Sequence, residues 1–125
     1  MKILATLPIL LLTAACAHAA GIEQLGMLSA RPDVQCDVEV SYGSACCGIN
    51  AGAHEGISKA VAARTDVRRA VEWSWGREGE RTLCVAATSP AAGKAIFHDL
   101  SALRFPSTNH SATAVTRGDE RVALD

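Results

Sequence analysis

The amino-acid sequence predicts one small α+β domain, a two-layer sandwich in which two helices cover one face of a small antiparallel sheet. Three observations indicate this fold class. Residues 36–42 and 71–75 alternate apolar and polar side chains, as strands with one buried face do. Residues 51–64 carry apolar side chains at helical spacing, and so do the residues that follow Pro90. A glycine-rich turn at 76–80 is typical of a hairpin.

The expected elements follow one another as strand, helix, strand, strand and helix, with room for one more strand. Asn50 is a good N-cap for the first helix, and Ser89 followed by proline marks the start of the second. A crossover followed by a hairpin favours a ferredoxin-like βαββα(β) arrangement. The expected elements are, in order, a strand at 36–42, a helix at 51–64, strands at 71–75 and 81–88, and a helix from residue 90 to just before Pro106.

The domain itself is expected at residues 35–106 of the 125-residue chain, after a lead-in segment at 20–34 that packs on it. Residues 107–125 form a polar tail, which is either disordered or adds one edge strand near 112–116. Without Lys2 the chain has eleven basic and thirteen acidic residues, a net charge of about −2. This balance gives no indication of a nucleic-acid partner.

Residues 1–19 have the layout of an export signal, with Lys2 followed by an apolar run that is too short to span a bilayer. Ala17-His18-Ala19 predicts cleavage before Ala20. Alternatively, Leu12-Thr13-Ala14-Ala15-Cys16 resembles a bacterial lipobox, with a lipoprotein signal at 1–15 and Cys16 as the lipidated first residue. We therefore expect a periplasmic or secreted protein, or a lipid-anchored protein that faces the periplasm.

Four cysteines remain for the exported domain, an even number that is typical of disulfide bonding. Cys36 begins the first strand, and Cys46 and Cys47 lie beyond its other end, roughly 20 Å away at the rise of a strand. A disulfide needs Cα atoms within about 7 Å, so Cys84 on the neighbouring strand is the expected partner of Cys36. The flanking Leu83 predicts that Cys84 points away from the core. A bulge, or a central strand covered on both faces, would remove this difficulty.

Cys46 and Cys47 then remain for each other, and three hypotheses stay open for them. In the first, one of them bonds Cys36 or Cys84 after all, and the set only stabilises the domain. In the second, the adjacent pair forms a reducible vicinal disulfide that exchanges with thiols, close to the positive end of a helix. In the third, the reduced pair binds a soft metal such as Cu(I).

The soft-metal hypothesis has a parallel in a known family. The element order from about residue 36 to 104 resembles that of heavy-metal-associated domains, which carry a thiol pair between the first strand and the first helix. The resemblance is one of layout. Their motif is M-x-C-x-x-C, where this chain has Ser44-Ala45-Cys46-Cys47.

Two tryptophans suggest where a partner could bind. Trp73 and Trp75 share one face of a strand, and an open sheet face with two aromatic side chains would mark an interaction site. The adjacent pair His54 and Glu55 is expected at solvated helix positions. No catalytic motif is present, so we expect a non-enzymatic binding module for a protein or a small ligand, stabilised by disulfides.

Overall fold

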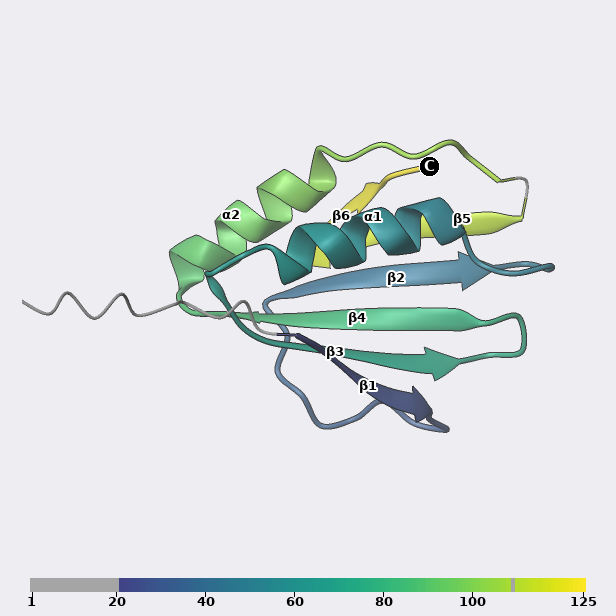
Figure 1. Cartoon of the computed structure of the whole chain (residues 1–125), viewed down its shortest axis with the longest axis horizontal. Coiled ribbons are helices and arrows are strands. Elements are labelled where there is room, and N and C mark those ends of the chain that lie inside the picture. The colour runs from purple at the N-terminus through teal and green to yellow at the C-terminus, as the bar shows by residue number, and fades with distance from the viewer. Residues whose placement is uncertain (1–20, 109) are drawn as a thin grey trace, which may run out of the picture.

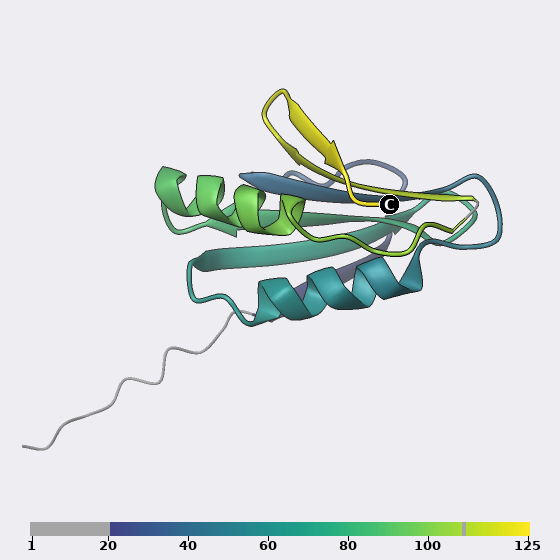
Figure 2. The ribbon, with the colours of Figure 1, turned by 90° about the horizontal axis from the view of Figure 1, so that it is seen from above.

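The protein folds into a mixed six-stranded sheet with two helices on one face (Figures 1 and 2). The computed structural model describes residues 21–108 and 110–125, so the predicted export signal and Cys16 lie outside the described residues. The predicted α+β class is confirmed. The elements are β1 (Ile22–Met27), β2 (Val38–Ser44), α1 (Ala51–Ala62), β3 (Val67–Trp75), β4 (Glu80–Ala87), α2 (Pro90–Ser101), β5 (Ser111–Arg117) and β6 (Glu120–Ala123).

The strand order across the sheet is β1-β3-β4-β2-β5-β6. β1 runs parallel to β3, and every other neighbouring pair is antiparallel. The sequence indicated at most four strands. The additional ones are β1, within the predicted lead-in, and β6, which pairs with β5 within the predicted polar tail.

The layer between the helices and the sheet is the main core. Ile57 and Val61 of α1, and Ile96 and Leu100 of α2, are at most 1 % exposed and pack with side chains such as Leu83 of β4. Burial of a side chain of this size contributes roughly 1.5–3 kcal/mol. The helices therefore derive their stability mainly from this face rather than from intrinsic propensity.

Both predicted N-caps are confirmed. The Asn50 side chain accepts a hydrogen bond from the backbone amide of Ala53 at 3.1 Å, and Ser89 accepts one from Ala92 at 3.1 Å. The Asn50 amide also donates to the carbonyl of Pro106 at 2.9 Å. This second bond attaches the segment after α2 to the start of α1.

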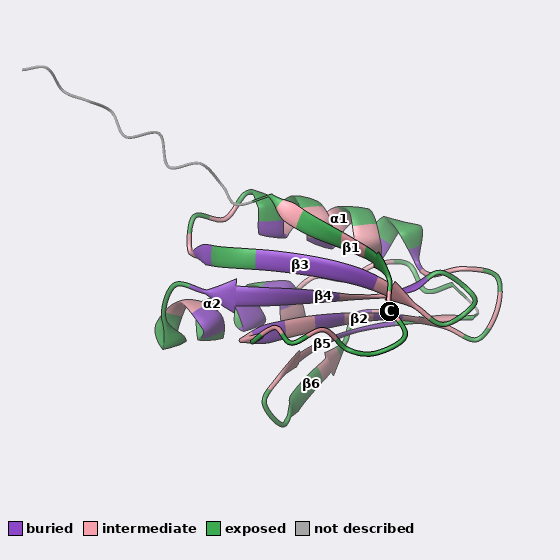
Figure 3. Cartoon of the chain, turned by 90° about the horizontal axis from the view of Figure 1, so that it is seen from below, coloured by how far each residue is buried: buried purple, intermediate pink, exposed green. Residues whose placement is uncertain are grey.

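The opposite face of the sheet is covered as well. Residues 28–36, which we call the strap, connect β1 to the start of β2 and pass below the sheet in Figure 1, on the side away from the helices. Beneath the strap lies a second cluster of buried side chains, Val71, Trp73 and Cys84. Strands β3 and β4 are therefore buried on both faces over much of their length (Figure 3).

The strap corrects one prediction about the tryptophans. Trp73 is only 5 % exposed, because Leu28 and Val34 pack against its cluster and Arg31 lies over its ring at 5.7 Å. Trp73 is a core residue and offers almost no surface to a partner. Trp75 is half-buried, and its indole nitrogen donates to the Thr82 hydroxyl at 3.0 Å.

Arg64 joins the end of α1 to the loop before β3 and to α2. Its guanidinium donates to Asp66 through two nitrogens at 2.8 Å and to Asp99 at 2.7 Å. The bond with Arg64 lowers the pKa of the Asp66 and Asp99 carboxyls. Groups whose pKa falls on folding stabilise the protein above their unfolded pKa, and this contribution is lost as the pH falls through the lowered values.

We therefore expect Arg64→Met to lower the free energy of unfolding at about pH 7 and to have a smaller effect at about pH 2.5, below the ordinary pKa of both carboxyls, where this contribution is being lost. Urea unfolding of the wild-type and variant proteins at the two pH values measures the difference. Arg77→Met, in the exposed turn between β3 and β4, is the matched control. An equal effect of Arg64→Met at both pH values would mean that the side chain acts through packing alone.

Candidate functional site

The Cys36–Cys84 disulfide attaches the strap to the centre of the sheet. The two Cα atoms are 5.2 Å apart, and Cys84 lies at the middle of β4. Leu83 and Val85 point to the helices, so Cys84 points to the opposite face, as the alternation predicted. The sequence raised the difficulty that Cys84 would point away from the core. The structure removes it, because the strap covers that face and makes β4 a central strand buried on both sides.

Other contacts fix the strap along its length. Both nitrogens of the Arg31 fork donate to the Glu39 carboxylate of β2 at 2.8 Å. The backbone amide of Leu28 donates to the carbonyl of Ser74 at 3.0 Å, which extends the pairing of β1 with β3. A two-point arginine–carboxylate pair has a defined geometry, so the strap has a fixed position over the sheet.

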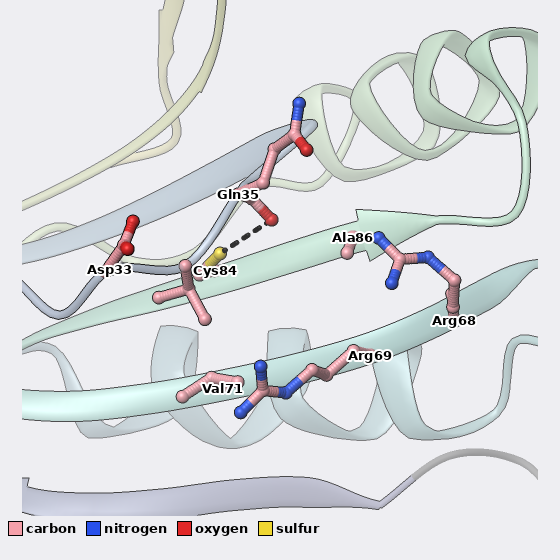
Figure 4. A pocket seen from close by; sticks show the side chains of 8 residues that line it. Asp33, Gln35, Arg68, Arg69, Val71, Cys84 and Ala86 are labelled. Carbon is pink, nitrogen blue, oxygen red and sulfur yellow. Dashed lines mark hydrogen bonds between the residues drawn. The ribbon is translucent and has the colours of Figure 1, made fainter.

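A cavity of about 190 Å³ lies between the strap and the sheet (Figure 4). We call it the strap cavity. The strap forms one wall, and β3 and β4 form the rest. The lining residues are Asp33, Val34 and Gln35 of the strap, Arg68, Arg69 and Val71 of β3, and Cys84 and Ala86 of β4.

A β-bulge brings two arginines to this one cavity. Neighbouring residues of a regular strand point to opposite faces. The pairing of β3 with β4 shifts between Val67, opposite Ala87, and Arg69, opposite Ala86, which leaves Arg68 as the extra residue. A bulge re-aims side chains locally. As a result, both Arg68 and Arg69 line the strap cavity.

The charged groups of the strap cavity differ in their partners. The Arg69 guanidinium donates to Glu23 of β1 at 3.0 and 3.3 Å. Among the described residues, Arg68 and Asp33 take part in no ion pair, either with each other or with a third group. Within the described ranges 21–108 and 110–125, the cavity thus holds one unpaired cation, Arg68, and one unpaired anion, Asp33, both exposed.

Cys46 and Cys47 are bonded to each other in the loop between β2 and α1. Cys47 is exposed and has a positive φ of 73°, a backbone conformation that residues other than glycine seldom adopt. Its backbone amide donates to the Glu78 carboxylate at 3.1 Å. The pair borders a second cavity of about 150 Å³, which His110 also lines.

A buried charge cluster was missed from the sequence. Glu72 of β3 is fully buried, with its carboxylate 2.8 Å from Nε2 of His54 and 3.1 Å from the Arg81 guanidinium. His54 was expected at a solvated position, but it lies half-buried over this carboxylate. Tyr42 packs edge-on against the His54 ring, and burial raises the pKa of its hydroxyl. A buried carboxylate needs such partners, so this cluster has a structural explanation.

Comparisons of the chain with protein-family models, with curated proteins and with solved structures found no match. Within the described part of the chain, no group of three or more His, Cys, Asp or Glu side chains is placed to hold a metal ion. Neither described helix is long and apolar enough to cross a membrane.

Removal of the strap disulfide should cost much more stability than removal of the vicinal one. Cys36–Cys84 spans 48 positions in sequence and Cys46–Cys47 only one, and the stabilisation by a cross-link grows with the loop that it closes. We expect the double variant Cys36→Ser/Cys84→Ser to lose about 2–5 kcal/mol in urea unfolding. Hydrogen exchange should also become faster in residues 28–36.

The double variant Cys46→Ser/Cys47→Ser is the matched control, with little expected change in either measurement. If the two double variants were equally stable and the strap stayed protected in both, the strap would be held by its other contacts.

Proposed function

We propose that this protein is an exported, non-enzymatic binding module that holds a small ligand in the strap cavity. Export follows from the signal pattern at residues 1–19, with membrane anchoring only if Cys16 is lipidated. The two disulfides fit an oxidising compartment. The fold would serve as the scaffold, with β3-β4-β2-β5 and both helices as a ferredoxin-like core to which β1 and β6 are added.

The observation that carries this proposal is the construction of the strap cavity. Its strap wall is attached to β4 through Cys36–Cys84, so the cavity does not have to be ordered when a ligand binds. A preorganised site avoids part of the entropic cost of binding. Ligand sites typically combine an apolar floor with a few convergent polar groups. Here Val71 and Ala86 would supply the floor, and the charged side chains would orient the ligand.

A substitution that fills the strap cavity should abolish binding. Ala86 is 4 % exposed and lines the cavity. We expect Ala86→Phe to remove every ligand-induced thermal shift that a small-molecule screen finds with the wild-type protein, because the ring occupies the site. Ala86→Leu fills less of the space and should weaken the same shifts.

Ala123→Phe, on the exposed face of β6, is the matched control and should keep the shifts. Circular dichroism confirms that each variant is folded. Ligands that bind a folded Ala86→Phe protein as well as wild type would place the binding site elsewhere.

A second candidate function is thiol–disulfide exchange at Cys46 and Cys47, favoured by the exposure of Cys47. A partner thiolate would attack Sγ of Cys47, form a mixed disulfide and release Cys46 as a thiolate. The partner would be a dithiol, and its second thiolate would then attack the partner's own sulfur in the mixed disulfide and release Cys47 as a thiolate. The partner would leave as a disulfide, and Cys46 and Cys47 would remain reduced. Cys47 lies three residues before Asn50, the N-cap of α1, and the positive end of a helix would stabilise a thiolate released close to it.

Exposure predicts the order in which the two disulfides are reduced. Cys84 is 2 % exposed and Cys36 is half-buried, whereas Cys47 is exposed. Exchange requires access of the attacking thiolate to sulfur. We expect stepwise addition of dithiothreitol, followed by alkylation and peptide mass mapping, to label Cys46 and Cys47 before Cys36 and Cys84. Labelling in the opposite order would end the exchange candidate.

The reduced pair would also be the place for a soft metal. Thiolates favour Cu(I), and the two sulfur atoms of Cys46 and Cys47 would supply its ligands. Titration of the reduced protein with Cu(I) tests this form of the second candidate. Cys46→Ser should abolish the uptake, and unchanged uptake would exclude the pair as a metal site.

A further inference from the structure

We propose that the strap cavity takes a small dipolar molecule with a carboxylate at one end and an ammonium group at the other. Arg68 would hold the carboxylate and Asp33 the ammonium. This inference rests on the proposed binding function and adds the chemical class of the ligand. Figure 4 shows Asp33 and Arg68 on opposite sides of the cavity, with Cys84 and Val71 between them.

The cation of the site is Arg68. The bulge in β3 directs its side chain to the same cavity as Arg69, although the two residues are adjacent in sequence. Arg69 is already bonded to Glu23, whereas Arg68 has no carboxylate partner among the described residues. A guanidinium presents paired donors that match a carboxylate in a two-point arrangement. Arg68 is therefore the group available for an incoming carboxylate.

The anion of the site is Asp33. It belongs to the strap, three positions before Cys36, whose disulfide fixes this wall of the cavity. The neighbouring strap arginine, Arg31, is bonded to Glu39 and leaves Asp33 without a cation among the described residues. A carboxylate that lines a cavity and has no partner can accept hydrogen bonds from an ammonium group.

The two charges together select the ligand class. A simple carboxylate would be attracted by Arg68 but repelled by Asp33 in the same cavity, and a simple amine would meet the opposite conflict. A dipolar molecule satisfies both groups at once. The volume of the strap cavity also fits a small ligand, since about 190 Å³ is below the roughly 300–1,000 Å³ of pockets that bind drug-sized molecules.

The experiment uses a series of dipolar probes with increasing separation of the charges, namely glycine, 4-aminobutyrate and 6-aminohexanoate. Butyrate and butylammonium are the probes with a single charge. Binding to the full exported protein is followed by nitrogen–proton NMR, including the side-chain Nε–H signals of Arg68 and Arg69. We expect at least one dipolar probe to bind tenfold or more tightly than either singly charged probe, and to shift the Arg68 signal.

Two variants test the assigned roles. Arg68→Ala and Asp33→Asn should each weaken the binding of the best dipolar probe at least tenfold. In Asp33→Asn, the affinity for this probe should come close to the affinity for butyrate. Arg77→Ala and Asp119→Asn make the same changes of charge at exposed turn positions and should leave binding unchanged. All four positions are exposed, so the folded state should persist.

Two results would overturn the inference. Equal binding of butyrate and the dipolar probes, with no effect of Asp33→Asn, would show a site for anions only. Absence of any shift at Arg68 with every probe would show that the charges are not used. In both cases the proposed binding function survives if the Ala86→Phe variant loses the binding of another ligand. It fails if that variant binds every ligand as the wild-type protein does.

Discussion

The Cys36–Cys84 bond is the constraint on which the second layer of this protein depends. The strap has no regular secondary structure, and ordering such a segment costs roughly 1–2 kcal/mol for each residue. Its apolar contacts, chiefly with Val71 and Trp73, are few. A cross-link between positions 48 apart reduces the entropy of the unfolded chain and so offsets part of that cost. The bond thereby allows β3 and β4 to bury both faces, which a chain of this size could not easily achieve with helices alone.

Two-sided burial also explains the charge cluster under α1. Glu72 alternates with Val71 and Trp73 along β3, and the strap covers these two on one face while α1 covers Glu72 on the other. A carboxylate in such a place is tolerated only with partners, which His54 and Arg81 provide. The cluster therefore links α1, β3 and β4 on the helix side of the sheet, as the disulfide links the strap to β4 on the other.

The parts of the fold that depend on local sequence could be predicted, and the parts that depend on pairing could not. Both helices begin at N-caps that a few residues define, and the hairpin follows from its glycines. β5 was expected only as an edge strand or as disordered chain, but it lies between β2 and β6, and the pairing with β2 buries its polar Thr113 to 1 % exposure. β1 is only six residues long with four exposed positions, so it lacks the alternation of a strand. Trp73 was expected on an open face of the sheet, because residues 28–36 have no sequence pattern that predicts that they cross this face.

The candidate site was concealed for the same reason. Arg68 and Arg69 appear in the sequence as ordinary surface charges, and only the register shift against β4 brings both to one cavity. Asp33 reaches that cavity through a disulfide that joins distant parts of the chain. If the strap cavity binds a ligand as proposed, that binding and this disulfide would be thermodynamically linked. A ligand that binds only when the strap is in place stabilises the strapped form by mass action, and by reciprocity an intact Cys36–Cys84 bond raises the affinity for the ligand. The bond that holds the second layer would then also set the strength of binding.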